Sequence, residues 1–179
     1  VRTTMPDLAI IGGTGLARLP GLTELRRERC NTAYGEPSAE VLIGAIGETE
    51  LLFLPRHGNP HRLPPHKINY RANLYALHVL GATGVLAVNA VGGITEEMGP
   101  GVIAIPDQII DYTWGREHTV DEDTSRELMH IDFTSPYDHE VREGLLAAAR
   151  SLEIPHEPRA VHAVTQGPRL ETAAEISRL

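Results

Sequence analysis

An apolar segment that runs straight into a cluster of glycines marks the start of the chain. Residues 9–11 are apolar and suit a buried strand, and residues 12–15 read Gly-Gly-Thr-Gly. Glycine backbones can turn sharply and let their N–H groups close around a phosphate. The segment therefore predicts a strand followed by an anion-binding turn. It leaves open a dinucleotide, a nucleotide, a free ion, or a tight turn that binds nothing.

The glycine spacing matches neither common nucleotide fingerprint. Read from Gly13, the pattern G-x-G-x-x-G requires a glycine where Arg18 stands. Read from Gly12, it requires one where Thr14 stands. Pro20 also interrupts the helix that a dinucleotide fold places after this loop. The P-loop pattern fails because no Gly-Lys-Ser/Thr follows. An NAD-binding domain is left as a distant alternative.

Composition fits one globular domain and argues against several partners. The 179 residues carry a formal net charge of −8, with 41% hydrophobic and 22% charged residues. Nucleic acid and anionic membranes repel so acidic a chain, and we expect neither as a partner. Cys30 is the single cysteine, which excludes an intrachain disulfide and fits a cytoplasmic location. No apolar run approaches the ~18 residues of a membrane span.

Strand and helix patterns alternate along the first half of the chain. Two apolar segments, residues 41–46 and 51–58, flank a Gly-Glu pair and predict a hairpin with a tight turn. Residues 69–84 predict a helix with Asn69 as its N-cap and Gly81 as its stop. The apolar run 85–94 then predicts a strand that is buried on both faces.

The second half continues the same alternation. Its patterns predict a strand, a long polar connection, a further strand with its loop, and the start of a helix, at residues 101–112, 113–134, 159–171 and 172–179. Ser135 and Pro136 favour the start of a helix that continues to residue 152. This order predicts an α/β fold in which helices flank a mixed central β-sheet, within a single domain over residues 1–179.

A basic loop follows the hairpin. Arg56 and His57 stand where an apolar strand ends, and open α/β sheets place ligand-contacting groups there. A guanidinium can hold two phosphate oxygens through a planar fork, and an imidazole adds a directional donor. His57, His61 and His66 also suggest zinc, although their spacing falls in a proline-broken loop rather than on a helix face. A solvated basic loop is the remaining alternative.

A third segment, "VNAVGGI" at residues 88–94, combines an amide with small residues at a strand end. Asn89 and the neighbouring backbone N–H groups can approach a ligand closely there. Taken alone, the segment is better explained as a strand end that merely turns at two glycines. The segment gains significance because it follows the glycine turn and the basic loop in that order along the chain.

Five segments, in order, resemble the trimeric purine nucleoside phosphorylase and methylthioadenosine phosphorylase family: "IIGGTG", "PRHG", "NYRANLYAL", "VNAVGGI" and "TQGPRLETAAEI". The resemblance runs from residue 8 to the end and is nearest to the bacterial S-methyl-5'-thioinosine phosphorylase branch. It implies the nucleoside phosphorylase type of α/β fold. It also implies that inorganic phosphate, a cosubstrate, attacks C1' of a purine nucleoside, with no cofactor and no metal.

The resemblance implies a set of phosphate-binding residues. The family's residues match Thr14, Arg56, His57, Asn89 and Ala90. The anion left open by the glycine turn is then free phosphate.

For the purine, the resemblance implies that Leu170 stacks on the base and that Glu171 reads its polar edge. A glutamate there favours 6-oxopurines, and so S-methyl-5'-thioinosine. Methylthioadenosine or purine nucleosides in general are the alternatives. Glu171 has a second interpretation, in which it only stabilises the positive N-terminus of the helix after it.

Two further implications concern the assembly and the end of the chain. His130 matches a family histidine that contacts the 5' substituent in a neighbouring subunit's site, although a histidine on a surface connection explains it almost as well. The homotrimer is implied by the resemblance to the family alone. Family members continue past Leu179 with residues that contact the ribose and protonate the purine. We therefore expect a chain truncated at its C-terminus, and a binding module without activity is the non-enzyme alternative.

Overall fold

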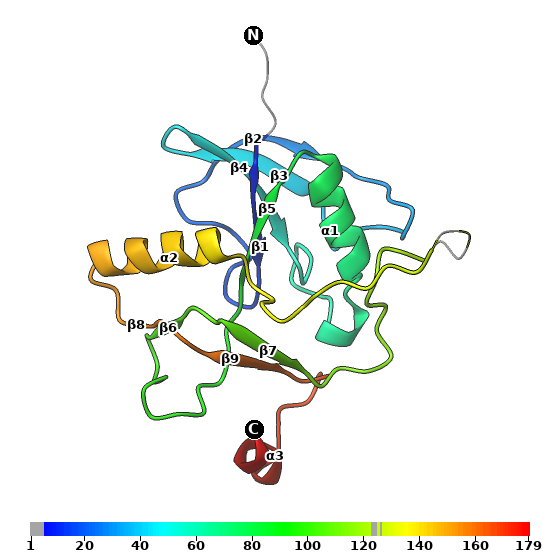
Figure 1. The fold of residues 1–179 in the computed structure, drawn as a ribbon. Coiled ribbons are helices and arrows are strands. Elements are labelled where there is room, and N and C mark those ends of the chain that lie inside the picture. The colour runs from blue at the N-terminus through cyan, green and yellow to red at the C-terminus, as the bar shows by residue number, and fades with distance from the viewer. Residues whose placement is uncertain (1–5, 123–124, 126) are drawn as a thin grey trace. The chain divides into compact units, whose positions relative to one another are not determined.

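The computed structural model describes residues 6–122, 125 and 127–179, and the chain forms two compact units (Figure 1). The N-terminal unit contains Val1–Val91 and Arg116–Asp121. The C-terminal unit contains Gly92–Gly115 and Glu122–Leu179. A single domain over the whole chain stays a prediction. None of the helices in the described residues is long and apolar enough to cross a membrane.

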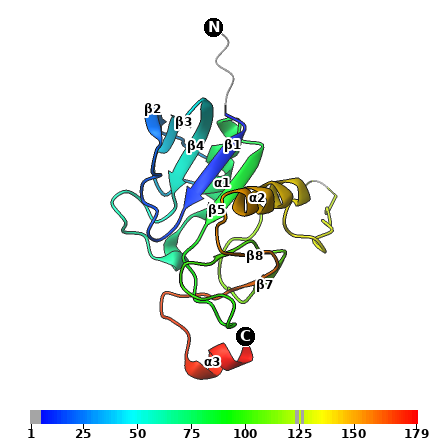
Figure 2. The ribbon, with the colours of Figure 1, turned by 90° about the vertical axis from the view of Figure 1, so that its left-hand side faces the viewer.

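A five-stranded mixed sheet forms the centre of the N-terminal unit. Its strands lie in the order β2-β3-β4-β1-β5, which Figure 2 shows side by side. Their bounds are β1 Leu8–Gly12, β2 Thr23–Glu28, β3 Val41–Ile46, β4 Thr49–Pro55 and β5 Gly84–Val88. Strand β1 is parallel to β4 and β5, whereas β3 is antiparallel to β2 and β4. The predicted mixed central sheet is confirmed.

The predicted hairpin is confirmed as well. Ile46 of β3 pairs with Thr49 of β4 across a two-residue turn. Gly47 adopts a φ of 59°, the left-handed conformation that such tight turns require. Strand β2 was not predicted, because its sequence, TELRRE, is charged and largely exposed at the edge of the sheet. Edge strands commonly carry such charges.

Helix α1, Tyr70–Val79, covers the sheet and closes the core of the N-terminal unit. As predicted, Asn69 is the N-cap, since its side chain accepts a hydrogen bond of 3.1 Å from the Ala72 backbone N–H. Gly81 follows the last turn with a φ of 97°. The helix buries Ala76 and Leu77 against apolar side chains of three strands, namely Ala9, Ile11, Val41, Ile43, Leu52 and Leu54. A short 3-10 helix, Pro65–Lys67, precedes α1.

The prediction that residues 85–94 form a strand buried on both faces is wrong. Strand β5 ends at Val88 and lies at the edge of the five-stranded sheet. Val85 and Val88 are 41% and 40% exposed. In the part of the chain that the structure describes, no strand pairs with the outer edge of β5. An apolar sequence alone does not say how many neighbours a strand has.

The C-terminal unit contains two parallel strand pairs and two helices. Their bounds are β6 Ile103–Ala104, β7 Gln108–Asp111, α2 His139–Ser151, β8 His156–Glu157, β9 Val161–Val164 and α3 Ala173–Arg178. Strand β6 pairs with β8, and β7 pairs with β9. The predicted strand over residues 101–112 is therefore two strands, separated at Pro106, whose missing N–H cannot continue a ladder.

Helix α2 begins later than predicted, at His139 rather than at Ser135. Its N-cap is Asp138, whose carboxylate accepts a hydrogen bond of 2.9 Å from the Val141 backbone N–H. The helix buries Leu146 against Ile105 in a small apolar cluster of this unit. A better cap inside the segment thus overrides the Ser-Pro signal.

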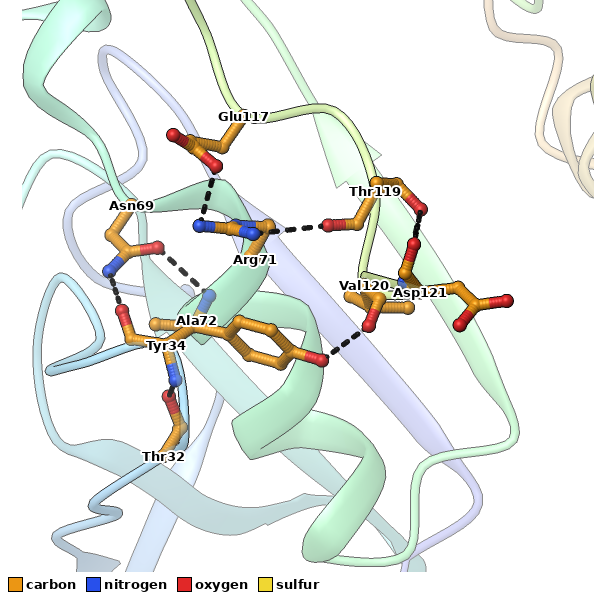
Figure 3. A network of polar contacts seen from close by, with 9 residues as sticks. All are labelled: Thr32, Tyr34, Asn69, Arg71, Ala72, Glu117, Thr119, Val120 and Asp121. Carbon is orange, nitrogen blue, oxygen red and sulfur yellow. Dashed lines mark hydrogen bonds and ion pairs between the residues drawn. The ribbon is translucent and has the colours of Figure 1, made fainter. Parts of the chain in front are cut away.

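The return segment, Arg116–Asp121, packs on the N-terminal unit (Figure 3). Arg71 of α1 forms an ion pair of 2.7 Å with Glu117. The Tyr34 hydroxyl donates a hydrogen bond of 2.6 Å to the Val120 carbonyl oxygen. The Tyr34 ring also lies 4.9 Å from the Arg71 guanidinium. Arg71 and Tyr34 together anchor the segment.

Candidate functional site

Three parallel strands of the N-terminal unit end at the same level. Gly12 of β1 is in register with Pro55 of β4 and with Val88 of β5. The residues that follow leave the sheet side by side, and they are Gly13, Arg56 and Asn89. Carboxyl ends of parallel strands are where open α/β sheets bind ligands. The structure thus brings together three segments that the sequence singled out.

The side chain of Arg56 lies across this edge. Its backbone N–H donates a hydrogen bond of 3.0 Å to the Gly12 carbonyl oxygen. Its guanidinium donates to the Val88 carbonyl oxygen at 3.2 Å and to the side-chain oxygen of Asn89. A Cβ atom on Gly13 would lie 2.6 Å from a guanidinium nitrogen of Arg56. Glycine at this position therefore leaves room for the arginine.

The Arg56 guanidinium is half-buried beside uncharged oxygen atoms. Burial lowers the pKa of Arg56 from its usual value, but arginine stays protonated in proteins. Within the described residues it forms no ion pair with a carboxylate. A partly desolvated cation without a counter-charge favours the binding of an anion. This edge can therefore hold a small anion through the guanidinium fork.

The turn after β1 presents Thr14 at the same edge. The Leu16 backbone N–H donates a hydrogen bond of 3.0 Å to the Gly13 carbonyl oxygen, which closes the turn. Gly15 has a φ of 84°, a conformation that this turn requires and that glycine adopts without strain. Thr14 and Ala90 are both exposed, next to Gly13 and Asn89 respectively.

His57 is only 6% exposed and is bound to its own loop. Its Nδ1 atom lies 2.7 Å from the Leu63 carbonyl oxygen. Burial lowers the pKa of His57 below its usual value, so the ring is neutral at pH 7 and carries its proton on Nδ1. Its Nε2 atom is buried and has no hydrogen-bond partner among the described residues. The Nε2 lone pair is therefore an acceptor without a partner in the part of the chain that the structure describes.

The histidines of the basic loop do not form a metal site in the described residues. The rings of His57 and His61 stack face to face, with centroids 4.4 Å apart and an interplanar angle of 5°. In residues 6–122, 125 and 127–179, no group of three His, Cys, Asp or Glu side chains could hold a metal ion. The zinc interpretation therefore finds no ligand set in this part of the chain.

A cavity of about 210 Å³ lies at the strand ends of the C-terminal unit. Asp111 of β7 is in register with Val164 of β9, so Tyr112 and Thr165 leave this strand pair at the same level. Both residues line the cavity, together with Trp114, Gln166, Gly167, Arg169, Glu171, Glu175, Arg178 and Leu179. Of the sequence-predicted site residues, Glu171 is the one that the structure places in this cavity.

Glu171 is bound to the end of a strand rather than to the helix that follows it. The Thr165 hydroxyl donates a hydrogen bond of 2.5 Å to Oε1 of Glu171. The N-terminus of α3 is closed by a capping box of Thr172 and Glu175, with backbone-to-side-chain distances of 2.7 and 3.2 Å. Glu171 is therefore not part of the cap of α3.

Arg169 reinforces this cap. Its guanidinium donates two hydrogen bonds of 2.8 Å to the carboxylate of Glu175. These bonds, together with the Thr172 backbone N–H, lower the pKa of Glu175 to about 2. Glu175 is thus a structural carboxylate at the rim of the cavity.

The two other residues predicted to contact the nucleoside, Leu170 and His130, are not among those that line the cavity. Leu170 is 86% exposed, and His130 is exposed in the long connection. Their roles stay predictions. The sequence reasoning missed Tyr112 and Thr165, although each directly follows a strand, the same signal that pointed to Arg56.

Comparison with known proteins gives consistent matches. The phosphorylase superfamily model matches residues 7–179. A probable S-methyl-5'-thioinosine phosphorylase of Pseudomonas syringae pv. tomato is 53% identical over 175 residues, which are 98% of this chain and 71% of that protein. A 6-oxopurine nucleoside phosphorylase of Pyrococcus furiosus is 46% identical over 177 residues, covering 96% of this chain and 66% of that protein.

A solved structure agrees with these relatives. The methylthioadenosine phosphorylase from Schistosoma mansoni in apo form superposes with a TM-score of 0.89 at 30% identity, covering 97% of this chain and 68% of that one. The predicted fold of nucleoside phosphorylase type is confirmed. With a family model that matches residues 7–179 and a relative 53% identical, this chain belongs to the phosphorylase superfamily.

Proposed function

We propose that the protein is a purine nucleoside phosphorylase whose preferred substrate is S-methyl-5'-thioinosine. In the reaction a phosphate oxygen forms a bond to C1' of the nucleoside. The bond from C1' to the purine breaks, its electron pair stays with the base, and the base takes up a proton. The observation that carries the proposal is the half-buried Arg56 guanidinium, with no carboxylate partner in the described residues, at the meeting point of three strand ends.

Arg56 orients the phosphate and takes no covalent part in the reaction. Positive charge grows on the ribose in the transition state, and an adjacent phosphate anion stabilises that charge. Thr14, Asn89 and the backbone of Ala90 add donors at the same edge. Each charge-assisted hydrogen bond to the anion is worth about 1.5–3 kcal/mol. Positioning of the nucleophile is thus the main contribution of the N-terminal unit.

His57 contacts the phosphate as an acceptor in this proposal. Its Nδ1 proton is bound to the Leu63 carbonyl oxygen, and its buried Nε2 has no partner in the described residues. Inorganic phosphate at neutral pH retains at least one hydroxyl group, which can donate to that nitrogen. His57 would then recognise the protonated oxygen while Arg56 holds the charged ones.

Glu171 reads the base. A carboxylate accepts the N1–H of a 6-oxopurine, whereas the N1 of a 6-aminopurine has no proton and would leave both groups unpaired. Leu170 stacks on the base, and His130 of a neighbouring subunit contacts the 5' substituent in a homotrimer. The reaction needs neither a metal nor an organic cofactor.

A 6-aminopurine substrate is the second candidate. The solved relative is a methylthioadenosine phosphorylase, and an S-methyl-5'-thioadenosine phosphorylase of Hyperthermus butylicus is 44% identical over 170 residues. The carboxylate of Glu171 in the cavity favours the 6-oxo base over this alternative.

The test is phosphate-dependent release of purine. S-Methyl-5'-thioinosine and S-methyl-5'-thioadenosine are each incubated with the full-length protein, with and without phosphate, and free base is measured. We expect release of hypoxanthine only when phosphate is present, and an unchanged rate after a chelator is added. Release that does not depend on phosphate, or none from either nucleoside, contradicts the proposal.

A further inference from the structure

Thr165 occupies a rigid position beside the cavity of the C-terminal unit. It directly follows β9, whose last residue, Val164, is in register with Asp111 of β7. The Tyr112 backbone N–H donates a hydrogen bond of 2.8 Å to the Val164 carbonyl oxygen, so the strand pairing continues up to Thr165. The backbone at this position is therefore fixed by the sheet.

The next residue is fixed as well. The side-chain oxygen of Gln166 accepts a hydrogen bond of 3.2 Å from the Trp114 backbone N–H, on the segment that follows β7. The two strand ends are thus tied to each other beyond their last paired residues. Side chains carried here have a defined direction relative to the cavity they line.

Glu171, by contrast, is carried by a loop. Residues 168–170 before it are exposed, and so is Thr172 after it. A long carboxylate on such a loop has several rotamers, and ordering it costs conformational entropy. The hydrogen bond of 2.5 Å from the Thr165 hydroxyl connects the Glu171 carboxylate to the end of strand β9, where the backbone is fixed.

We propose that Thr165 is a positioning residue that sets selectivity for 6-oxopurines by holding Glu171 as a hydrogen-bond acceptor. A threonine hydroxyl has a single proton, and here it is donated to Oε1 of the carboxylate. The other carboxylate oxygen remains available to accept N1–H from the base. The inference rests on the proposed function, because it takes Glu171 to be the group that reads the purine.

The consequence is confined to one class of substrate. A 6-oxopurine gains from a carboxylate that is already oriented, since less entropy is lost when it binds. A 6-aminopurine offers no proton at N1, so it gains nothing from the same acceptor. Loss of the Thr165 hydroxyl should therefore lower kcat/KM for the 6-oxopurine nucleoside and leave kcat/KM for the 6-aminopurine nucleoside unchanged.

The experiment compares Thr165→Val, which removes the hydroxyl at nearly constant shape, with Thr165→Ser, which retains it. kcat/KM is measured for S-methyl-5'-thioinosine and S-methyl-5'-thioadenosine, with the KM for phosphate as an internal control. For Thr165→Val we expect the ratio of the two kcat/KM values to fall about 10-fold, through a higher KM for the 6-oxo nucleoside, because the Glu171 carboxylate must then be ordered when the nucleoside binds. Thr165→Ser should stay within about 2-fold of the wild type.

A double-mutant cycle tests whether Thr165 acts through Glu171. In the Glu171→Ala background, the Thr165→Val change should no longer alter the substrate ratio. A Thr165→Val effect that is equal for both nucleosides, or that persists in the Glu171→Ala background, overturns the proposal and indicates a merely structural role.

The outcomes separate this inference from the proposed function. If Glu171→Ala changes the substrate ratio and Thr165→Val does not, the positioning role is wrong and the proposed function stands. If the wild-type protein releases no purine from either nucleoside with phosphate, the proposed function fails, and the role of Thr165 falls with it.

Discussion

The guanidinium of Arg56 donates a hydrogen bond to the side-chain oxygen of Asn89, although the strands that carry them, β4 and β5, are not neighbours. Strand β1 lies between them and is followed by Gly13, whose lack of a side chain leaves room for the arginine guanidinium. Because arginine can only donate, the Asn89 oxygen must face it, and the amide N–H groups face away. Arg56 and Asn89 therefore both have N–H groups left with which to donate hydrogen bonds to an anion.

Removal of the Arg56 guanidinium should abolish most activity without unfolding the protein. We expect Arg56→Ala to lower kcat/KM for phosphate at least ~100-fold, because the bidentate contact to the anion is lost. Arg56→Lys should recover only part of this, since an ammonium lacks the planar fork. Arg29→Ala, which removes an exposed ion pair with Glu36, is the matched control and should behave as the wild type. A near-normal kcat/KM for phosphate in Arg56→Ala would exclude Arg56 from the phosphate site.

The isosteric change Asn89→Asp should be more harmful than Asn89→Ala. An aspartate would give Arg56 the carboxylate partner that it lacks in the described residues, and would repel the incoming anion. We expect the KM for phosphate to rise roughly 100-fold in Asn89→Asp and about 10-fold in Asn89→Ala, measured with nucleoside in excess. Equal effects of the two variants would show that the charge at this edge is not what selects the ligand.

The stability of the protein should depend on the protonation of His57. Burial lowers the pKa of this histidine in the folded state, so the unfolded chain binds more protons in the acid range. The contribution of neutral His57 is complete above the unfolded pKa of about 6.5 and is lost as the pH falls through that value toward the folded pKa.

His57→Asn removes this titration, because an asparagine amide can still donate to the Leu63 carbonyl oxygen. We expect the fall in Tm between pH 7.5 and pH 5.5 to be smaller in His57→Asn than in the wild type, by about 2–4 °C for each kcal/mol of linkage. Thermal unfolding followed by circular dichroism at several pH values gives the comparison. Parallel Tm curves for the two proteins would contradict the prediction.

Replacement of two glycines by alanine should change the stability of the protein in opposite directions. Gly144 lies inside α2, is exposed, and has no atom within 4 Å of an added Cβ, so Gly144→Ala should stabilise the protein by about 0.5–1 kcal/mol through helix propensity. Gly101 has equal space but a φ of 89°, and Gly101→Ala should destabilise by roughly 1–2 kcal/mol. Denaturant unfolding measures both. The same sign for both variants would disprove this assignment to backbone conformation.

Local signals were enough to predict the hairpin and α1. A Gly-Glu pair between apolar runs fixes the turn between β3 and β4, and Asn69 and Gly81 mark the two ends of the helix. Each of these features depends on contacts between residues close together in sequence. The strand ends that gather Gly13, Arg56 and Asn89 were also foreseeable, because parallel strands place their carboxyl ends at one edge.

Features that depend on distant partners were not predicted. Strand β2 is recognisable only through its pairing with β3, and the exposure of β5 follows from its position at the sheet edge. The link between Thr165 and Glu171 requires the loop between them to fold back, which no spacing rule specifies. The capping box of Thr172 and Glu175 could have been read from sequence, and it would have shown that α3 does not need Glu171 as its cap.

The return segment, Arg116–Asp121, limits where recombination can divide the gene without loss of contacts in the N-terminal unit. Arg71 and Tyr34 are synthesised long before Glu117 and Val120, the residues that they bind, so on the ribosome the N-terminal unit is completed only after residue 121 has emerged. Recombination at residue 91 would transfer a gene segment that encodes Arg71 and Tyr34 without the residues that they bind, Glu117 and Val120. Exchange of the N-terminal unit between related genes therefore preserves these contacts only when the stretch that encodes residues 116–121 is inherited with it.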